Sequence, residues 1–297
     1  MIPFIEKTIR KELGGKYDFR DTKLCFLKFS TPSSGAGLND KVLFFVFKDD
    51  EEEPFLVIKT VRNYEAKFVI EQGFSRLKQL NDLIQNIPYG KMFPHAVYLY
   101  DDGKEFIFSV ETTCHGKRVG RSEGDLRKIL EKYNDWQKDT FSGGKNFTYD
   151  INNYYLDVIK TLDLKEKDHK EITDYFLKLI SGKEIKVSRI PQHGDLTTDN
   201  ILIGRDGLSI VDCERFGLVT LPGFDIFYIL SRFYGRKIDS RYSQALDKYF
   251  QMLGIGLKPE PYLYFIYYLY DLSFKKEYAL KNKKAKDIIS DFETSLN

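Results

Sequence analysis

Cysteine is scarce in this sequence, and long apolar runs are missing. Cys25, Cys114 and Cys213 are scattered, odd in number and without metal-ligand spacing, which argues against a disulfide framework and a zinc site. No run approaches the roughly 20 apolar residues of a membrane-spanning helix. The start, MIPFIEKTIRKEL, mixes charged with apolar residues, unlike a secretory signal. We therefore expect a cytoplasmic protein without a membrane span.

An excess of one charge sign is also missing. The chain has 46 Lys and Arg residues against 44 Asp and Glu residues, a formal net charge of +2. Nucleic-acid-binding proteins usually carry a basic excess, so we expect no nucleic-acid partner. With 297 residues, the chain is long enough to bury roughly three quarters of its unfolded surface. It can therefore form one large domain or two lobes.

The most informative stretch is Gln192 to Glu214, QHGDLTTDNILIGRDGLSIVDCE. A β-type run, residues 187–191, comes before it. Within it, apolar runs at residues 200–203 and 208–211 are separated by GRDG. An Asp-Gly pair between apolar runs predicts a hairpin, because the turn needs residues that tolerate positive φ.

Three oxygen-bearing side chains flank this hairpin. Asp195 and Asn200 lie at the entrance of its first strand, and Asp212 lies at the exit of its second. Phosphoryl transfer uses one carboxylate to orient the nucleophilic hydroxyl, with an Asn and a second carboxylate holding magnesium. Magnesium prefers such oxygen ligands. The alternative is a polar loop whose Asp and Asn residues only cap turns.

The pattern His193-Gly194-Asp195, then Asn200, then Ile210-Val211-Asp212-Cys213-Glu214 resembles the signature of the aminoglycoside phosphotransferase and choline kinase-like family. The resemblance implies an α+β, two-lobed protein-kinase-like fold, with a β-rich nucleotide-binding lobe at residues 1–110 and a mainly helical catalytic lobe at 111–297. It also implies that Asp195 is the catalytic base, that Asn200 and Asp212 bind Mg²⁺, and that His193 supports the loop.

In the first lobe, the resemblance assigns nucleotide contacts to a loop between two β-type runs. The loop is Thr31 to Asp40, TPSSGAGLND. Ser34, Gly35 and Gly37 would let backbone N–H groups approach the phosphates. An ordinary hairpin connection remains the alternative.

A lysine near the end of the apolar strand FLVIKT, Lys59, matches the lysine that contacts the α and β phosphates in this fold. A helix glutamate should brace it. Glu71 is the best match within a helix expected at residues 65–85, where Phe68, Glu71, Gln72 and Ser75 fit one face and its rim. Glu65 is a second candidate, and a solvated charge at a strand end is the alternative for Lys59.

A second hairpin is expected at residues 96–100 and 104–110, around Asp101-Asp102-Gly103. By resemblance, the hinge between the lobes follows at residues 109–113. There the backbone of Glu111 and Thr112 would bind the purine of ATP or GTP.

Helices are expected through the second lobe, ending in an aromatic-rich segment, residues 262–274. Its aromatic side chains would form core or, by resemblance, one wall of an acceptor cleft. Asp225 would cap a helix or brace the loop that carries Asp195. Glu214 would either bind the metal directly or contact a residue that binds it.

The sequence thus predicts magnesium-dependent transfer of the ATP or GTP γ-phosphate to a hydroxyl of a small molecule, such as a sugar, an amino alcohol or an antibiotic. A nucleotide-binding pseudokinase or regulatory module is one alternative. A protein kinase is another, but only nine residues separate Asp212 from Pro222, too few for its usual activation segment. The lysine-rich tail disfavours a polycationic aminoglycoside. Neither the acceptor nor the oligomeric state follows from the sequence.

Overall fold

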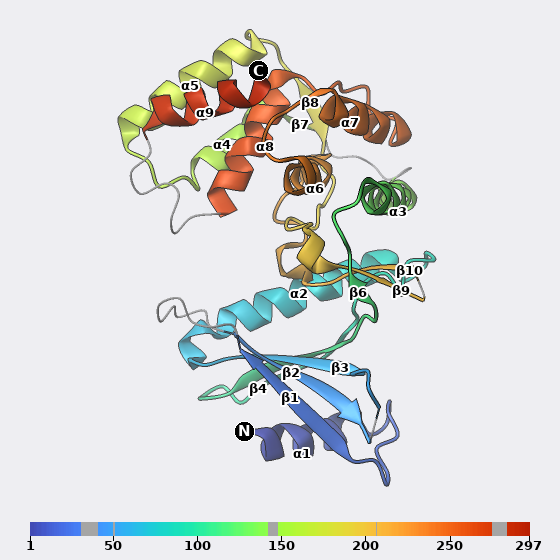
Figure 1. Ribbon diagram of the computed structural model, residues 1–297. Coiled ribbons are helices and arrows are strands. Elements are labelled where there is room, and N and C mark those ends of the chain that lie inside the picture. Colours follow the sequence, from blue (N-terminus) through green and yellow to red (C-terminus); the bar gives the residue numbers. More distant parts are fainter. Residues whose placement is uncertain (31–40, 50, 142–147, 206, 275–283) are drawn as a thin grey trace. The chain divides into compact units, whose positions relative to one another are not determined.

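The computed structural model of the chain (Figure 1) forms two compact units. The residues it describes are 1–30, 41–49, 51–141, 148–205, 207–274 and 284–297. The first unit comprises Met1–Lys117 and Leu202–Glu214, and the second comprises Arg118–Ile201 and Arg215–Asn297. The lobe boundary was expected at residue 110. The chain leaves the first unit after Lys117, and it returns to that unit for the hairpin that follows the catalytic loop.

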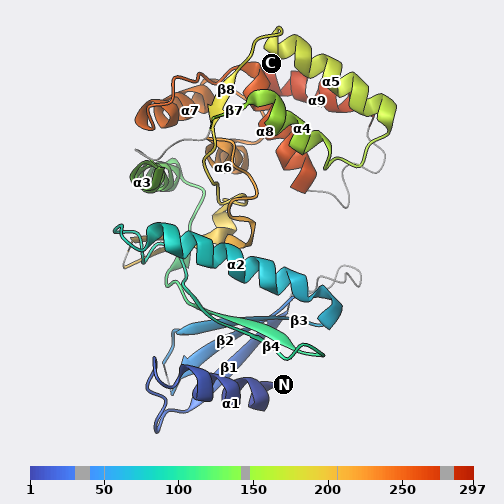
Figure 2. The same ribbon diagram turned by 180° about the vertical axis from the view of Figure 1, so that it is seen from behind.

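The first unit is built on an antiparallel sheet in the order β1-β2-β3-β5-β4. Its strands are β1 (Leu24–Ser30), β2 (Lys41–Lys48), β3 (Leu56–Val61), β4 (Ala96–Asp101) and β5 (Ile107–Thr112). Every residue of β3 is buried, as expected for a strand covered on both faces. Helices α1 (Ile2–Leu13) and α2 (Lys67–Ile84) lie on opposite faces of this sheet (Figure 2). Helix α2 follows a short 3-10 turn, η1 (Tyr64–Ala66).

The second hairpin differs from its prediction most at the start of its second strand. Strand β5 begins at Ile107, three residues later than expected. The Asp102 carboxylate accepts hydrogen bonds from the backbone N–H groups of Lys104, Glu105 and Phe106, each at 2.9 Å. An aspartate side chain that satisfies backbone donors offers them an alternative to the strand ladder, so the turn extends over these residues.

The neighbouring Asp101 gives the first unit a predicted acid sensitivity. Its carboxylate accepts hydrogen bonds from the Tyr64 hydroxyl at 2.6 Å, the Gly103 N–H at 2.7 Å and the Lys67 ammonium at 3.0 Å. These donors, Tyr64 first, lower the pKa of Asp101 from 3.8 to about 2. Because the folded-state pKa is the lower one, the stabilisation is present above pH 3.8 and is lost as the pH falls towards 2.

We therefore expect Asp101→Asn to flatten the decline of the melting temperature between pH 4 and pH 2, because the substitution removes this proton uptake. Thermal unfolding followed by circular dichroism at several pH values measures the slope. Tyr64→Phe removes the largest contributor and should act in the same direction. An unchanged slope in both variants would contradict the assignment.

The second unit is mainly helical. Its helices are α3 (Glu123–Phe141), α4 (Ile151–Ile159), α5 (Glu166–Ile180), α6 (Phe224–Tyr234), α7 (Ser240–Met252), α8 (Pro261–Phe274) and α9 (Ala285–Leu296). The aromatic side chains of α8 from Tyr262 to Tyr270 are all less than 10% exposed. A helix that is apolar on every side is a buried helix, so these aromatic residues form core.

Two short sheets and two 3-10 turns complete the described part of the fold. The run expected before the catalytic loop forms β8 (Lys186–Ser188), which pairs with β7 (Thr148–Asp150). The hairpin after the loop consists of β9 (Ile201–Gly204) and β10 (Gly207–Ile210), in a sheet of order β10-β9-β6 with β6 (Lys117–Arg118). The 3-10 turns η2 (Thr198–Asn200) and η3 (Cys213–Arg215) flank this hairpin.

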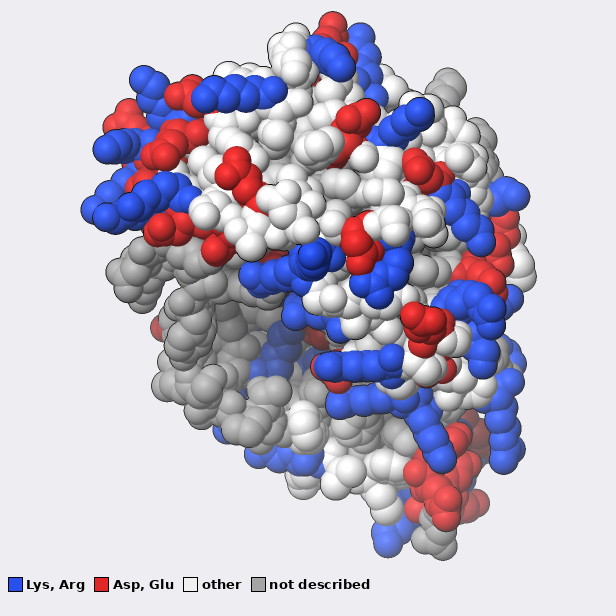
Figure 3. Space-filling view, turned by 45° about the horizontal axis from the view of Figure 1, so that its top comes forward, with Lys and Arg blue, Asp and Glu red and all other residues white. Residues whose placement is uncertain are grey.

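The surface charge and the helices can be compared with the predictions made from the composition. Acidic and basic side chains are intermixed over the face drawn in Figure 3. Among the described helices, none has both the length and the apolar character needed to span a membrane.

Candidate active site

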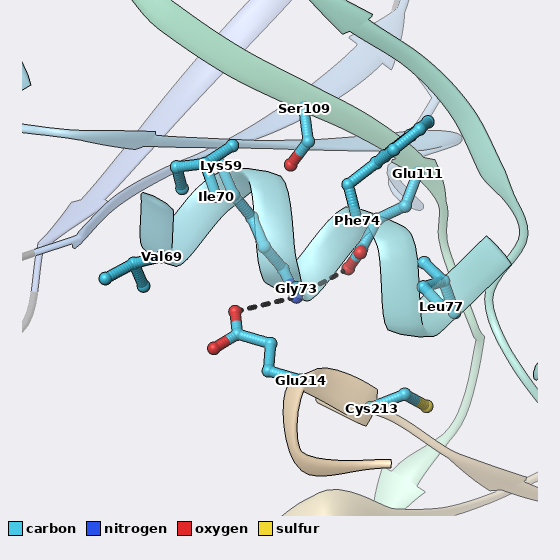
Figure 4. Close-up of a pocket in the computed structure, with 10 residues that line it drawn as sticks. All are labelled: Lys59, Val69, Ile70, Gly73, Phe74, Leu77, Ser109, Glu111, Cys213 and Glu214. Atoms are coloured by element: carbon cyan, nitrogen blue, oxygen red, sulfur yellow. Dashed lines mark ion pairs between the residues drawn. The ribbon is translucent and has the colours of Figure 1, made fainter. Parts of the chain in front are cut away.

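In the first unit, Lys59 is held among carboxylates. Its side-chain nitrogen lies 3.0 Å from Glu111 Oε1, 3.5 Å from Glu214 Oε1 and 3.9 Å from Asp212 Oδ1. The sheet explains the contact with Glu111, because Lys59 pairs with Ser109 across β3 and β5 and Glu111 is two residues further along the same face of β5. The cavity in Figure 4 is lined by Lys59, Glu111 and Glu214 with residues of α2.

The carboxylates keep the buried lysine charged. Lys59 is 9% exposed, and burial by itself lowers the pKa of an ammonium group. The negative charges of Glu111 and Asp212 outweigh this effect, so the pKa of Lys59 is raised. The first unit therefore carries a permanent, oriented cation of the kind that can bind a phosphate.

The structure does not bring Glu71 to Lys59. Glu71 pairs instead with Lys67, 3.5 Å away and one helical turn earlier. The α2 residues that line the Lys59 cavity are Val69, Ile70, Gly73, Phe74 and Leu77. Glu71 lies about 200° around the helix from Gly73. The helical face predicted to be buried, which contained Phe68 and Glu71, is also wrong, because the Phe68 side chain is 48% exposed.

Glu65, the second candidate, is also directed elsewhere. Its carboxylate accepts a hydrogen bond from the Asn63 side-chain amide at 3.3 Å, and its backbone N–H is capped by the same residue at 3.0 Å. Glu65 and Glu71 thus have local partners, and the carboxylates at Lys59 come from β5, from η3 and from Asp212, the residue before η3.

The predicted hinge residues lie within the sheet. Glu111 pairs with Val57 on one side and Ala96 on the other. The backbone N–H of Thr112 donates to His95 O at 2.9 Å, and its hydroxyl accepts from His95 N–H at 2.8 Å. Glu111 therefore acts on the Lys59 cavity through its side chain.

The three predicted phosphate-loop residues, Ser34, Gly35 and Gly37, lie outside the described part of the chain. Strands β1 and β2 on either side of the loop are antiparallel, and their register brings Ser30 opposite Val42.

In the second unit, Asp195 and Asn200 are in contact. The Asn200 amide nitrogen donates to the Asp195 backbone oxygen at 2.9 Å and to its carboxylate at 3.3 Å. An Asn side chain has one amide NH₂ and one carbonyl oxygen, so this arrangement leaves the Asn200 oxygen available as a cation ligand.

Asp212, in the first unit, also has features that suit a metal ligand. Its side chain is 49% exposed, so ionised oxygens are accessible to a hard cation. Its backbone has φ 61°, a left-handed conformation that Asp tolerates better than most residues. Asp212 and Asn200, each taken by itself, thus offer oxygen atoms of the kind that magnesium prefers.

The loop that carries Asp195 is braced by a buried carboxylate. Asp225 is fully buried and accepts hydrogen bonds from the His193 N–H at 2.5 Å, from the Gly194 N–H at 3.0 Å and from the Tyr133 hydroxyl. Burial raises the pKa of Asp225, and the hydrogen bonds and His193 only partly offset this rise. Asp225 therefore braces the loop backbone, one of the two structural roles expected for it.

Gly194 explains the glycine in His-Gly-Asp. Its φ is 82°, and a Cβ at this position would lie 2.9 Å from the Arg215 backbone oxygen. Any other residue would be strained and would displace that backbone. Asp195 therefore directly follows the two residues whose backbone N–H groups donate to Asp225.

Two residues near Asp195, Tyr228 and Arg232, were not among those predicted from the sequence. The Tyr228 hydroxyl donates to Asp195 Oδ1 at 3.2 Å, and Arg232 donates to the Tyr228 hydroxyl at 2.7 Å. Burial, together with the Asp195 charge, raises the pKa of Tyr228 to about 12, so the hydroxyl remains a donor. The sequence could have indicated both residues, because they lie three and seven positions after Asp225 and so share its helical face.

Comparison with known proteins gives structural matches only. No protein-family model matches the chain, and no curated protein matches its sequence. Solved structures match over nearly the whole chain. Choline kinase from Cryptosporidium parvum Iowa II is 13% identical, with a TM-score of 0.58 and coverage of 99% of this chain and 95% of that one. A putative aminoglycoside phosphotransferase from Ralstonia eutropha JMP134 is 12% identical, with a TM-score of 0.57 and the same coverage.

A third match is an aminoglycoside phosphotransferase in complex with GDP and kanamycin. It is 13% identical, with a TM-score of 0.55 and coverage of 98% of each chain. At such low identities the likeness establishes the fold. This chain therefore has the two-lobed protein-kinase-like fold that the sequence predicted, shared with aminoglycoside phosphotransferases and choline kinase.

Proposed function

We propose that the protein is a small-molecule kinase, which transfers the γ-phosphate of ATP or GTP to a hydroxyl group in a magnesium-dependent reaction. The observation that carries the proposal is the Asp195–Asn200 pair on a loop braced by Asp225, within a protein-kinase-like fold. Structures with this fold support a nucleotide and a small acceptor. One is a complex with ADP and streptomycin, and another is an amicoumacin kinase with AMP-PNP and Ca²⁺.

The roles follow from the chemistry of each group. Asp195 accepts the proton of the acceptor hydroxyl, and Tyr228 and Asn200 hold its carboxylate in place. Lys59 binds nucleotide phosphate. Asn200 and Asp212 bind Mg²⁺, which supplies charge neutralisation for the phosphates when bound. Most of the rate enhancement in such a reaction comes from positioning and electrostatics.

The remaining nucleotide contacts are also proposals. The loop with Ser34, Gly35 and Gly37 covers the phosphates through its backbone. Glu111 acts through Lys59, and Thr112 ends the strand that leads to the purine-binding backbone. We further propose a cytoplasmic location, which is supported by the fact that Cys25, Cys114 and Cys213 are all free thiols.

The decisive experiment measures ATP and GTP consumption by the purified protein with magnesium, against sugars, nucleosides, amino alcohols and aminoglycosides. We expect acceptor-dependent turnover, with neutral acceptors ahead of polycations. Arg232 places a positive charge beside Tyr228, which contacts Asp195, and a like charge at a binding site disfavours a cationic ligand. Nucleotide binding without turnover on any acceptor would favour the regulatory module instead.

A further inference from the structure

We infer that Glu214 and Glu111 position Lys59 in this protein, in place of a glutamate from helix α2, and that Gly73 is required to leave room for Glu214. The inference rests on the proposed function, because it concerns the lysine proposed to bind phosphate. It differs from the expected arrangement, in which a helix glutamate braces this lysine.

Glu214 connects three elements of the first unit. One oxygen of its carboxylate is 3.5 Å from Lys59 on β3, and the other forms an ion pair with Lys41 at the start of β2. Its backbone oxygen accepts a hydrogen bond from Arg76 of α2 at 2.7 Å. The side chain is 20% exposed, so these charge interactions are weakly screened by solvent. Glu214 is thus held in place by two ammonium groups at its carboxylate and by one guanidinium at its backbone oxygen.

Gly73 lies directly beside this carboxylate (Figure 4). A Cβ at position 73 would lie 3.2 Å from Glu214 Cγ and 3.6 Å from Cδ. The first of these contacts is tighter than a Cβ usually makes, so an alanine would require the Glu214 side chain to shift by a few tenths of an ångström. Glycine within a helix costs about 1 kcal/mol relative to alanine. The space it leaves for Glu214 accounts for a glycine in the middle of α2.

Glu111 completes the arrangement from the strand side. Its carboxylate is 3.0 Å from the Lys59 nitrogen, and its side chain is 12% exposed. An ammonium group has three donors. Glu111 at 3.0 Å and Glu214 at 3.5 Å lie closer to this nitrogen than Asp212 at 3.9 Å, so two carboxylates position the lysine and a donor remains for a phosphate oxygen.

The test uses Glu214→Gln and Gly73→Ala in the full chain. Isothermal titration calorimetry measures the binding of Mg·AMP-PNP and Mg·ADP, and a melting curve measures stability. We expect each variant to lower nucleotide affinity about tenfold, the loss expected for one hydrogen bond to a charged group. Gly73→Ala should keep or raise the melting temperature, because alanine is the better helix former. A purely structural role for Gly73 predicts no such separation of affinity from stability.

Two further variants sharpen the result. Gly124→Ala, in α3, is the matched control, because its added Cβ would meet only the Ser122 hydroxyl at 3.8 Å; it should bind nucleotide like the wild type. The double variant Gly73→Ala, Glu214→Gln should be no weaker than either single variant, since both changes remove the same contact.

The outcomes separate the two levels of the argument. Wild-type protein that binds neither nucleotide would overturn the proposed function and this inference with it. Wild-type binding that Glu214→Gln leaves unchanged, or that Glu71→Gln lowers instead, would overturn the positioning role alone.

Discussion

Asp195→Asn is expected to lower kcat by about a thousandfold, within the range that a positioned general base contributes, while the affinity for Mg·AMP-PNP stays within a factor of two to three of the wild type. Asparagine has the shape of aspartate and keeps an oxygen for the Tyr228 hydroxyl, so the loop should retain its fold. It cannot accept the proton of the acceptor hydroxyl. Steady-state turnover on the acceptor found in the panel, together with calorimetric nucleotide titration, measures both quantities.

Asp199→Asn is the matched control for this substitution. Asp199 lies four residues after Asp195 but is exposed, and its only recorded partner among the described residues is Arg118, 3.5 Å away. This variant should keep wild-type kcat. Substantial turnover in Asp195→Asn, or an equal loss in both variants, would remove Asp195 from the role of base.

Asp225→Ala is expected to give the largest loss of stability, about 3 to 5 kcal/mol, as for other broken networks around a buried charge. The substitution leaves the Tyr133 hydroxyl and the N–H groups of His193 and Gly194 buried without their acceptor. Each such orphaned donor is costly. Urea unfolding of the second unit, monitored by the fluorescence of the buried Trp136, measures the change.

Asp239→Ala provides the comparison for Asp225. Asp239 is the partly exposed N-cap of α7, and its carboxylate accepts hydrogen bonds from the Arg241 backbone N–H and from the Arg241 guanidinium, each at 3.0 Å. Loss of such a cap typically costs about 1 kcal/mol. If Asp225→Ala were no more destabilising than this control, the loop would not depend on the buried carboxylate.

The geometry of the loop from His193 to Asn200 was predictable because its signals are local. The spacing from His193 to Asn200 and the Asp-Gly turn depend on neighbouring residues, and the structure shows Asp195 bound to Asn200 as well as the hairpin that follows. The strands of the first unit were similarly clear, because they are short runs rich in β-branched and aromatic residues, such as KVLFFVFK in β2.

The partners of Lys59 were not predictable from local patterns. Glu214 is distant in sequence from Lys59. The side of α2 that faces the lysine depends on how the helix is rotated about its axis, and Phe68 was misleading because it is apolar but exposed. The start of β5 was missed because Asp102 bonds three successive backbone N–H groups. To predict the partners of Lys59 and the start of β5, one would have to know which groups these side chains contact in the folded protein.

The return of residues Leu202–Glu214 to the first unit has a consequence for protein synthesis. Chains emerge from the ribosome N-terminus first, and domains usually fold in that order. Here the first unit lacks one hairpin and Glu214 until most of the polypeptide has been translated, so Lys59 is without one of its carboxylates during that time. A fragment that ends at Lys117 would reproduce this incomplete state, and a faithful excision of the unit would need the hairpin grafted back by a linker.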